Sequence, residues 1–548
     1  MSAAAKEATL DSEFPTPAFI DYANPFDFTF AFVATTAVAT EAAQLPLDLH
    51  NSGRRTAHDG RKKVAVVGAG ITAASLAYRL YDEYGSIVPL DITVYEAASQ
   101  VGGRINSTAI DNRANHYTGF VNTGASVFSA DDLCLQAAID DTGLRRKVVE
   151  VPYLKTTVGV WDGQTFILCR SRNLKSRTKI DYVRDVLKYG LSARKLQILL
   201  KDKLSRFREL YGDSSFPNPS LPDAIQRLRL EEESKKSAYD YMVDNELPLE
   251  LLHDIIQPSV RASFAHNLSD LNALSALIAM NPSATYRLNS HPRGNLELAY
   301  RLLRLSEARI LLNTRVSRIG RSSKGKYTVV ISQDNARTTS RAEEDNEYDA
   351  VVIATHLQGA GVQFDFPTPL THSLLPTFVE RHVTHFTSRL ESKLAPSFFN
   401  LTTADDIPDL IFTTPEAHRH HRADIFTIEH SYASAGFHGD VEEVENLYKI
   451  TSSRPIPDSM IAGMLGKTPE SPLYLLGIKW IHRQVWPLAS PRRTRGPRLD
   501  NIELADGMFY TGISDELLSS MEMNCRIGRR VADIIFQKFA PPLKEAEA

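Results

Sequence analysis

The sequence has little cysteine, no long apolar run and no excess of charge of either sign. Cys134, Cys169 and Cys525 are its three cysteines, too few and too scattered for a disulfide scaffold or a zinc site. No apolar stretch reaches the ~18 residues that a membrane-spanning helix needs. Lys and Arg number 62 and Asp and Glu 66, giving a net charge of −4, whereas nucleic-acid-binding proteins are usually strongly basic.

Several catalytic signatures are also missing: the nucleophile elbow G-x-S-x-G, the zinc motif H-E-x-x-H and the P-loop. His418, His420 and His421 have no carboxylate or thiolate set beside them, so we predict a solvated loop and no metal site. The remaining composition, 43% hydrophobic in 548 residues, is that of a globular protein large enough to enclose a cofactor.

The N-terminal 61 residues fit two interpretations. Phe28–Thr40 is uncharged and partly apolar, like a weak signal-peptide core. The stretch before it, however, is acidic and has Lys6 as its one basic residue, whereas a secretory signal begins with a positive region. We favour a cytoplasmic N-terminal arm and keep secretory or vacuolar targeting as the alternative.

A strand–helix–strand unit begins after residue 62. Val64–Val67 is a short β-branched run, Ile71–Tyr84 has apolar residues at helical spacing, and Asp91–Tyr95 is a second strand. This order is typical of the βαβ unit of a parallel sheet.

The turn of this unit carries a dinucleotide-binding fingerprint, G-x-G-x-x-A. Gly68 permits a tight turn, Gly70 lets the backbone approach a pyrophosphate, and Ala73 lets helix and strand pack closely. Glu96 closes the second strand, where an acidic side chain binds ribose hydroxyls. The phosphates would lie at the helix N-terminus.

The residues after Glu96 indicate which dinucleotide is bound. Gly102-Gly103-Arg104 follows at a spacing that resembles the FAD-binding segment shared by amine oxidases, phytoene desaturases and their relatives. Gly103 would contact the cofactor, and Arg104 would hydrogen-bond phosphate or flavin. In the same resemblance, Val316 contacts the adenine side through its backbone.

The C-terminal segment 507–532 resembles the final flavin-binding element of these enzymes. A strand at Met508–Thr511 delivers the chain to the flavin, and a helix begins near Ser519-Ser520. Met521 and Glu522 fall in its first turn. The positive end of this helix dipole would stabilise negative charge on the reduced flavin.

Over residues 62–537 the chain resembles, more narrowly, the prenylcysteine oxidase (prenylcysteine lyase) family of FAD enzymes. The resemblance is carried by these motifs in order: Gly68–Ala73, Gly102–Ile105, Gly124–Val127, Trp161–Gly163, Tyr189–Ser192, Arg261–Asn272 and Ser520–Met523. It implies that Ser126 lies at the cofactor. It also implies oxidation of the thioether carbon of a prenylcysteine by hydride transfer to FAD, with O₂ restoring the flavin and giving hydrogen peroxide.

The chain departs from this family where substrate would be handled. The family's R-V-N-Y-G-Q stretch reads Arg261-Ala262-Ser263-Phe264-Ala265-His266 here. A tyrosine hydroxyl is replaced by the ring of Phe264 and an amide by the imidazole of His266, which titrates near neutral pH. We therefore predict an apolar pocket with His266 as a general base, the alternative being that both residues pack in the core.

These observations predict an α/β fold: a Rossmann-type FAD-binding domain with an inserted α+β substrate domain, as in amine oxidases. The expected FAD-binding segments are 62–170, 290–357 and 500–540, and the substrate segments are 171–289, mainly helical, and 358–499.

We expect Arg309–Ile319 and Lys326–Ile331 to be strand-like and Gln333–Glu347 to be an exposed hairpin tip. We expect 360–500 to mix short strands with Pro-rich loops, with Pro487–Arg498 as a basic surface loop and Trp480, His482 and Trp486 in core packing.

Three functions remain open at this level. The first is a flavin oxidase for a hydrophobic, prenylated or thioether-containing small molecule with O₂ as acceptor. The second is a tailoring enzyme of secondary metabolism that oxidises or cyclises a polyketide or meroterpenoid scaffold. The third is a flavin-binding protein without turnover.

Overall fold

The computed structural model describes most of the chain after residue 59. The described ranges are 60–110, 119–151, 157–171, 187–210, 221–281, 285–290, 293–332, 347–368, 377–417, 424–438, 441–492 and 501–540. The N-terminal arm, most of the expected hairpin tip and the histidines at 418–421 lie outside them.

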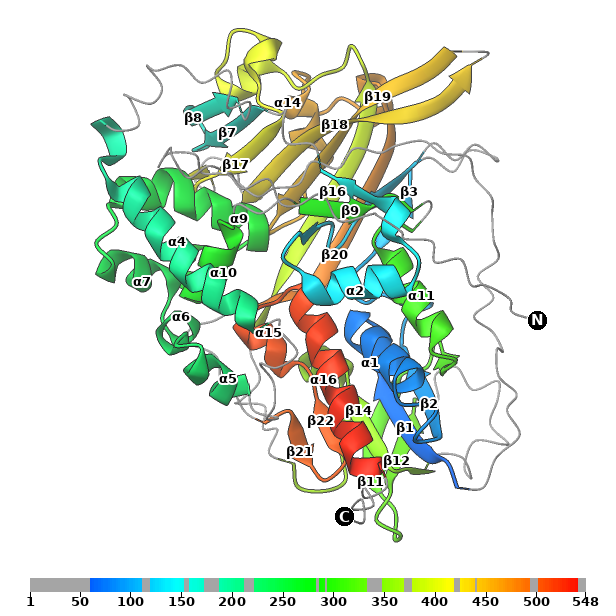
Figure 1. Ribbon diagram of the computed structural model, residues 1–548. Helices are drawn as coiled ribbons and strands as arrows, with labels where there is room; N and C mark the ends of the chain where they lie inside the picture. The colour runs from blue at the N-terminus through cyan, green and yellow to red at the C-terminus, as the bar shows by residue number, and fades with distance from the viewer. Residues whose placement is uncertain are drawn as a thin grey trace, which may run out of the picture.

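A parallel sheet forms the lower part of the molecule in Figure 1. β1 (Lys62–Val67), α1 (Ile71–Asp82) and β2 (Leu90–Tyr95) make the expected βαβ unit, and β1 pairs in parallel with β2 and with β14 (Ala350–Ile353). The sheet order is β10-β2-β1-β14-β22-β21, with β10 at Arg309–Leu311, β22 at Met508–Tyr510 and an antiparallel β21 at Glu503–Ala505. Segments from both ends of the chain thus meet in one sheet.

Helices cover one face of this sheet, and a second sheet covers the other. α1 packs against α16 (Met521–Phe539) and α11 (Leu296–Leu305) on the first face (Figure 1). The opposite face packs on a four-stranded sheet made of β11 (Val316–Arg321), β12 (Tyr327–Ile331), β13 (Glu347–Tyr348) and β15 (Gln363–Phe364). The strand-like segment expected at 309–319 is split between the two sheets, and Asn313 between them has φ +53°.

The upper part is built on a seven-stranded sheet of order β20-β16-β19-β18-β17-β7-β8. Four of its strands are long: β16 (Thr377–Arg389), β18 (Ile425–His438), β19 (Val441–Ser452) and β20 (Ile478–Arg492). The expectation of short strands and loops over 360–500 was therefore wrong, and Pro487–Arg492 lies in β20. β7 (Thr157–Trp161) and β8 (Phe166–Ser171) pair with β17 (Leu410–Thr413), although we had grouped their residues with the first FAD-binding segment.

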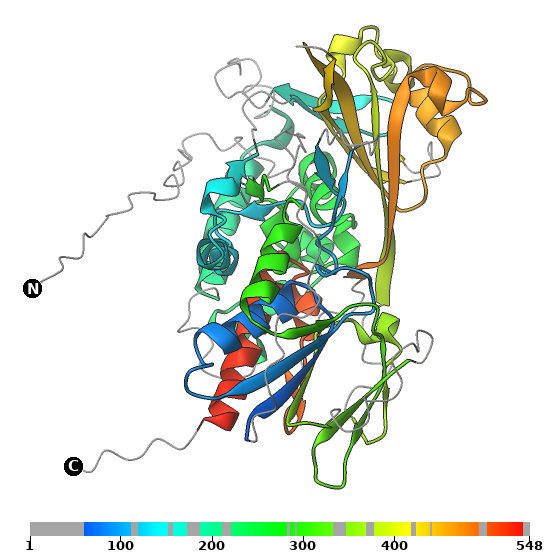
Figure 2. The same ribbon diagram turned by 90° about the vertical axis from the view of Figure 1, so that its right-hand side faces the viewer.

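The two faces of the seven-stranded sheet have different neighbours. One packs on the helical segment, which contains α4 (Ser192–Glu209), α5 (Leu221–Arg227), α6 (Glu231–Lys235), α7 (Ala238–Asp244), α9 (Gln257–Phe264) and α10 (Ala273–Ala279). The other packs on α14 (Asp458–Met464) and short turns. Figure 2 shows β16 and β20 running from this sheet toward the parallel sheet.

Short elements join the two parts. They are β3 (Ser107–Ala109), β4 (Phe120–Asn122), β5 (Phe128–Ser129), α2 (Leu133–Asp141), β6 (Val148–Glu150), β9 (Thr285–Leu288), α12 (Leu357–Ala360) and α15 (Ile513–Leu517). β5, β9 and β6 form one small sheet and β3 and β4 another.

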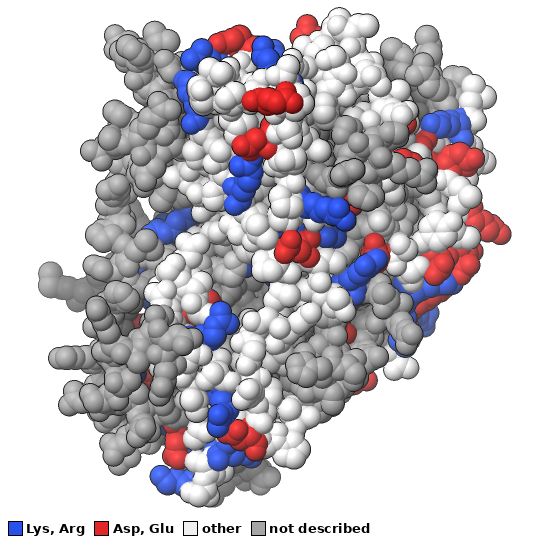
Figure 3. All heavy atoms as spheres, turned by 180° about the vertical axis from the view of Figure 1, so that it is seen from behind, with Lys and Arg blue, Asp and Glu red and all other residues white. Residues whose placement is uncertain are grey.

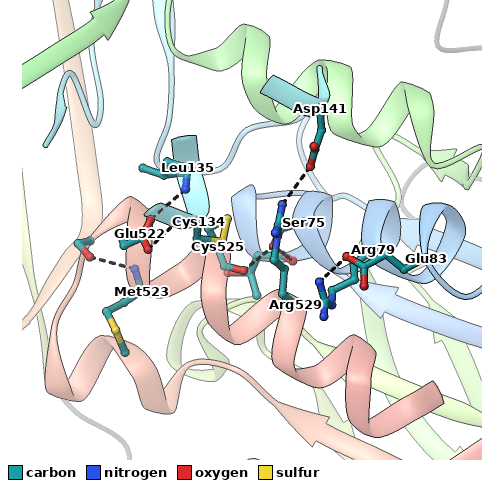
Figure 4. The surroundings of a disulfide bond; sticks show 12 residues. Ser75, Arg79, Glu83, Cys134, Leu135, Asp141, Glu522, Met523, Cys525 and Arg529 are labelled. Atoms are coloured by element: carbon teal, nitrogen blue, oxygen red, sulfur yellow. Dashed lines mark hydrogen bonds and ion pairs between the residues drawn. A yellow bond between two sulfur atoms is a disulfide. The ribbon is translucent and has the colours of Figure 1, made fainter. Parts of the chain in front are cut away.

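A disulfide that the sequence analysis missed joins α2 to α16. Cys134 and Cys525 are 391 residues apart in sequence, yet their Cα atoms are 6.2 Å apart (Figure 4). Both are buried, whereas Cys169 is exposed and free. A single bridge does not make a disulfide scaffold, as expected from the sequence. Two of the three cysteines are nevertheless neighbours in the fold, although they are far apart in sequence.

On the face opposite to that of Figure 1, basic and acidic side chains are interspersed, with neither sign gathered into one area (Figure 3). Among the described residues, no helix is long and apolar enough to cross a membrane. Within those same ranges, no group of three or more His, Cys, Asp or Glu could hold a metal ion.

Candidate cofactor site

The glycines of the fingerprint meet at the carboxyl ends of β1 and β14. Gly68 has φ +101°, and a Cβ there would lie 2.8 Å from the carbonyl oxygen of Ala354. This backbone conformation and this close packing both require glycine. Gly70 is the N-cap of α1 and bridges Gly102, and a Cβ on Gly103 would lie 3.4 Å from the Cα of Gly70.

Neither the backbone conformation at Gly70 nor the packing around it requires glycine. Its φ of −78° and ψ of −174° suit any residue, and a Cβ would meet nothing closer than the Gly102 carbonyl oxygen at 3.9 Å. The protein thus leaves space in front of the α1 N-terminus. A glycine in such a place lets a ligand phosphate approach the backbone, so the residues fit a dinucleotide.

Glu96 lies beside this turn. Its Oε2 accepts a hydrogen bond from the backbone N–H of Ala69 at 2.8 Å, and its Oε1 accepts one from the N–H of Ala98 at 2.8 Å. Each carboxylate oxygen can accept a further bond. Glu96 therefore orients the glycine turn and retains the capacity to bind ribose hydroxyls.

Arg104 connects the glycine segment to the C-terminal part. Its Nη2 donates to Oδ2 of Asp515 at 2.7 Å, and its Nη1 donates to Oγ of Ser519 at 2.7 Å and to the carbonyl of Ala489 at 3.1 Å. Asp515 is buried, and burial alone would raise its pKa. The Arg104 guanidinium and other hydrogen-bond donors outweigh burial and hold that pKa below its usual value.

His356 completes this network and was missed by the sequence analysis. Its Nε2 lies 3.2 Å from Oδ2 of Asp515, while its buried Nδ1 has no hydrogen-bond partner in the described residues. Burial, reinforced by the charge of Arg104, lowers the pKa of His356 to about 4, so the ring is neutral. The sequence signal for His356 is that it lies three residues after β14, at the carboxyl edge of a parallel sheet, where ligands bind.

α16 begins at Met521, as predicted. The Ser520 side chain accepts a hydrogen bond from the Met523 N–H, so Ser520 is the N-cap. The Glu522 carboxylate turns away to α2, where it accepts from the N–H groups of Cys134 and Leu135 at 2.9 and 3.0 Å (Figure 4). Met521 and Glu522 can therefore serve a flavin through backbone N–H groups, whereas the Glu522 side chain is engaged elsewhere.

The remaining residues assigned to the cofactor are buried or lie in a hydrogen-bonded segment. Ala73 is fully buried in α1 and Val316 is buried at the start of β11. Ser126 follows Ala125, whose N–H donates to the Arg104 carbonyl at 3.0 Å and whose carbonyl accepts from Asn295. The segment that contains Ser126 is thus fixed beside Arg104.

The candidate base His266 lies at the C-terminal end of α9. It is buried, and its Nε2 lies 2.7 Å from Oγ of Ser490 on β20. Ser490 follows Ala489, whose carbonyl accepts from Arg104. Phe264 packs instead against the helical core. His266 is therefore joined to the cofactor residues through β20, and Phe264 is a packing residue.

Comparisons with known proteins agree with this geometry. A family model described as prenylcysteine lyase matches residues 174–547, and one described as an NAD(P)-binding Rossmann-like domain matches residues 66–141. Prenylcysteine oxidase 1-like from Mus musculus is 24% identical over 508 residues, which are 88% of this chain and 92% of that protein. Prenylcysteine oxidase 1 from Bos taurus is 24% identical over 504 residues, 87% of this chain and 89% of that protein.

Solved structures resemble the whole arrangement. A triple mutant of putrescine oxidase superposes with a TM-score of 0.55 at 15% identity, covering 87% of this chain and 99% of that one. A putative protoporphyrinogen oxidase from Exiguobacterium sp. 255-15 gives a TM-score of 0.54 at 15% identity, with the same coverage. The expected fold class, an α/β fold with a Rossmann-type domain arranged as in amine oxidases, is confirmed.

Proposed function

Since the chain belongs to the prenylcysteine lyase family, we propose that it is an FAD-dependent oxidase of a hydrophobic, prenylated or thioether-containing small molecule. Its relatives in mouse and cattle are named prenylcysteine oxidases. We extend to this chain a substrate of that class: an apolar prenyl tail that carries a small polar end.

The observation that supports the cofactor assignment is the open space beside Gly70. Neither its dihedral angles nor its packing calls for glycine, so the space before α1 is kept for a ligand. The N-terminus of α16 lies in the same part of the molecule, joined to the glycine segment through Arg104, Asp515 and Ser519. Two helix N-termini and the glycine pairs suit the two ends of an extended dinucleotide.

Bound FAD would supply a two-electron acceptor for a substrate carbon–hydrogen bond, and O₂ would reoxidise it. The chain's own residues would hold the cofactor and keep water from it. Those assigned to FAD are Gly68, Gly70, Glu96, Gly103, Arg104, Ser126, the backbone of Val316 and the backbone N–H groups of Met521 and Glu522. His266 would accept a proton from the substrate.

The experiment that tests the function is anaerobic mixing with farnesylcysteine. The purified protein should show flavin bands near ~375 and ~450 nm, and the ~450 nm band should bleach when the substrate reduces the cofactor. A folded, colourless protein that takes up no FAD would remove the cofactor assignment. A yellow protein that does not bleach would retain it and favour a different substrate, as in the tailoring alternative.

The first mutational prediction concerns Gly70 and Glu96. Gly70→Ala should keep the fold because no atom obstructs the added Cβ, yet it should weaken FAD binding at least tenfold. Glu96→Ala should also weaken binding, because each charge-assisted hydrogen bond to ribose is worth ~1.5–3 kcal/mol. FAD titration of the apoprotein measures both, with Gly463→Ala in α14 as a control that should bind normally. Normal affinity in both variants would make the fingerprint purely structural.

A further inference from the structure

A row of polar side chains, three of them buried and one partly exposed, crosses one face of the seven-stranded sheet. His482 of β20 lies opposite His385 of β16, His385 lies opposite Lys449 of β19, and Lys449 lies opposite Glu429 of β18. Directly opposed residues of an antiparallel sheet share a face, so the four side chains point the same way. We call these four residues the polar row. His385 is fully buried, and Glu429 and Lys449 are 6% and 8% exposed.

Much of the hydrogen-bonding capacity of this row is unused. Both ring nitrogens of His385, Nε2 of His482 and Oε2 of Glu429 have no partner in the described parts of the chain, and neither has Oγ1 of Thr387 on the same face. Lys449 Nζ donates to Glu429 Oε1 at 3.0 Å. An unsatisfied buried polar group costs ~1–3 kcal/mol, so apolar residues here would make a more stable protein. A row that stays polar despite this cost indicates a partner from outside the chain.

The row lies on the sheet face that packs on β4 and on Ile110 beside β3. On the same side of β20 as His482, Trp486 donates from Nε1 to the Thr123 carbonyl at 2.9 Å. Thr123 lies just before Ala125, which bonds to Arg104, and its buried Oγ1 has no described partner either. The other face of the sheet packs on α14 and the turns around it, away from the cofactor residues.

The charges of the row cancel. Burial lowers the pKa of His385 well below its usual value, and the charge of Lys449 adds to this effect. Burial also lowers the pKa of His482. Both imidazoles are therefore neutral at neutral pH, each offering a donor and an acceptor. Lys449 and Glu429 neutralise each other as an ion pair.

We propose that the polar row binds the polar end of the substrate, and that this end carries no net charge. A hydroxyl, a carbonyl or a zwitterionic group could bond to the imidazoles and to Oε2 of Glu429 without leaving a buried charge uncompensated. This inference rests on the proposed function in taking the substrate to be an apolar chain with a polar end.

Binding of five farnesyl compounds that share one tail tests the inference without turnover. Calorimetry with the FAD-loaded protein would compare farnesol, farnesylcysteine, farnesyl phosphate, farnesylamine and the hydrocarbon farnesene, each presented in methyl-β-cyclodextrin. We expect farnesol and farnesylcysteine to bind at least tenfold more tightly than farnesene. The phosphate and the amine, which bring a net charge, should bind at least tenfold more weakly than farnesol.

Substitution of His385 separates a binding role from a structural one. His385→Leu should abolish the preference for farnesol over farnesene while leaving the thermal midpoint unchanged or raised, because it removes unsatisfied polar atoms. Glu429→Gln should weaken farnesylcysteine binding. The matched control is His430→Leu, next to Glu429 but on the opposite face. His430 bonds to Asn446 and stacks on Tyr448, so its loss should lower the midpoint and leave the preference intact.

The outcomes distinguish this inference from the proposed function. If polar-ended probes bind no more tightly than farnesene, or if no farnesyl compound binds, the row holds water alone and the inference is wrong. If His385→Leu keeps the wild-type preference, it is equally wrong. If farnesylcysteine binds through the row but does not bleach the flavin, the binding role of the row is retained and the proposed oxidation of this substrate is wrong.

Discussion

Glu522 has a buried carboxyl where the N-termini of α2 and α16 meet. Burial raises its pKa to about 7, although the hydrogen bonds from Cys134 and Leu135 oppose this. Asp132, also enclosed at this junction, has its pKa raised by burial and by the charge of Glu522. Protonation of Glu522 therefore stabilises the folded state at mildly acidic pH.

This pKa gives the stability of the protein a defined pH dependence. The pKa of Glu522 in the folded state exceeds the unfolded value of ~4.3. The stabilisation is thus fully present below ~4.3 and is lost as the pH rises through about 7. Glu522→Gln should flatten the decrease in unfolding free energy between pH 5 and pH 8, measured in urea. Glu297→Gln, which removes a carboxylate paired with Arg293 and Arg301, should keep the wild-type slope. Equal slopes in all three proteins would contradict this assignment.

His266 is the residue whose chemistry can be tested most directly. As a general base it should contribute ~100-fold or more to flavin reduction. His266→Ala should lose that factor and the associated pH dependence between about pH 6 and 9, where a histidine base titrates. Ser490→Ala, which removes the 2.7 Å contact, should lower the rate less and leave a titrating base. A His266→Ala enzyme as fast as wild type across this range would exclude the role.

At the scale of elements, the contact between α1 and α16 depends on one glycine. A Cβ on Gly528 would lie 2.3 Å from both the Thr72 carbonyl oxygen and Ser75 Oγ. Ser75 also donates to the Cys525 carbonyl at 2.9 Å, so the helices are joined by a hydrogen bond at the point of closest approach.

Gly528→Ala should therefore separate the two helices that carry the candidate cofactor contacts. Overpacking of this kind costs ~1–3 kcal/mol, and urea unfolding should show a loss of that size. Gly463→Ala in α14 is the matched control, since a Cβ there meets only Phe398 at 4.0 Å. Alanine in that helix should be neutral or stabilising by up to ~1 kcal/mol. Equal effects at both positions would show that the approach of α1 and α16 is not limiting.

The elements that the sequence predicted best are those with a local signal. β1, α1, β2 and the start of α16 follow from hydrophobic spacing, the glycine fingerprint and the resemblance of the C-terminal segment to a flavin-binding element. β20 could not be predicted in this way because Pro487 and Pro491 interrupt its pattern. It lies at the edge of its sheet, where a strand tolerates prolines. Arg104 was predicted from its glycine segment, but its contacts with Asp515 and His356 were not, because the three residues are far apart in sequence and meet only in the fold.

At the scale of the whole molecule, the disulfide closes a loop that contains the seven-stranded sheet and the helical segment. A bridge between α2 and α16 holds the first and last segments of the dinucleotide-binding part together. Disulfides form in oxidising compartments. The bridge therefore favours the secretory or vacuolar alternative over a cytoplasmic location.

Removal of the bridge should destabilise the protein by ~2–5 kcal/mol, because the loop that it closes in the unfolded chain is long. Cys134→Ser or Cys525→Ser should show this in urea unfolding without reductant. Cys169→Ser, at the exposed free cysteine, should not. With reductant the wild type should lose the same amount, and a protein insensitive to reductant would show that the bridge does not form in solution.

Because of the bridge, the backbone between residues 134 and 525 is not the sole covalent link between the two ends of the chain. The route from residue 134 to residue 525 runs along the chain and also through one sulfur–sulfur bond. A single proteolytic cut in the polar tract 333–347 would open the first route and leave the second. The two fragments should then migrate as one species on a denaturing gel without reductant and separate when thiol is added. Severed in this way, the halves of the parallel sheet would remain tethered, so the nicked protein should regain its fold after denaturation as a unimolecular process.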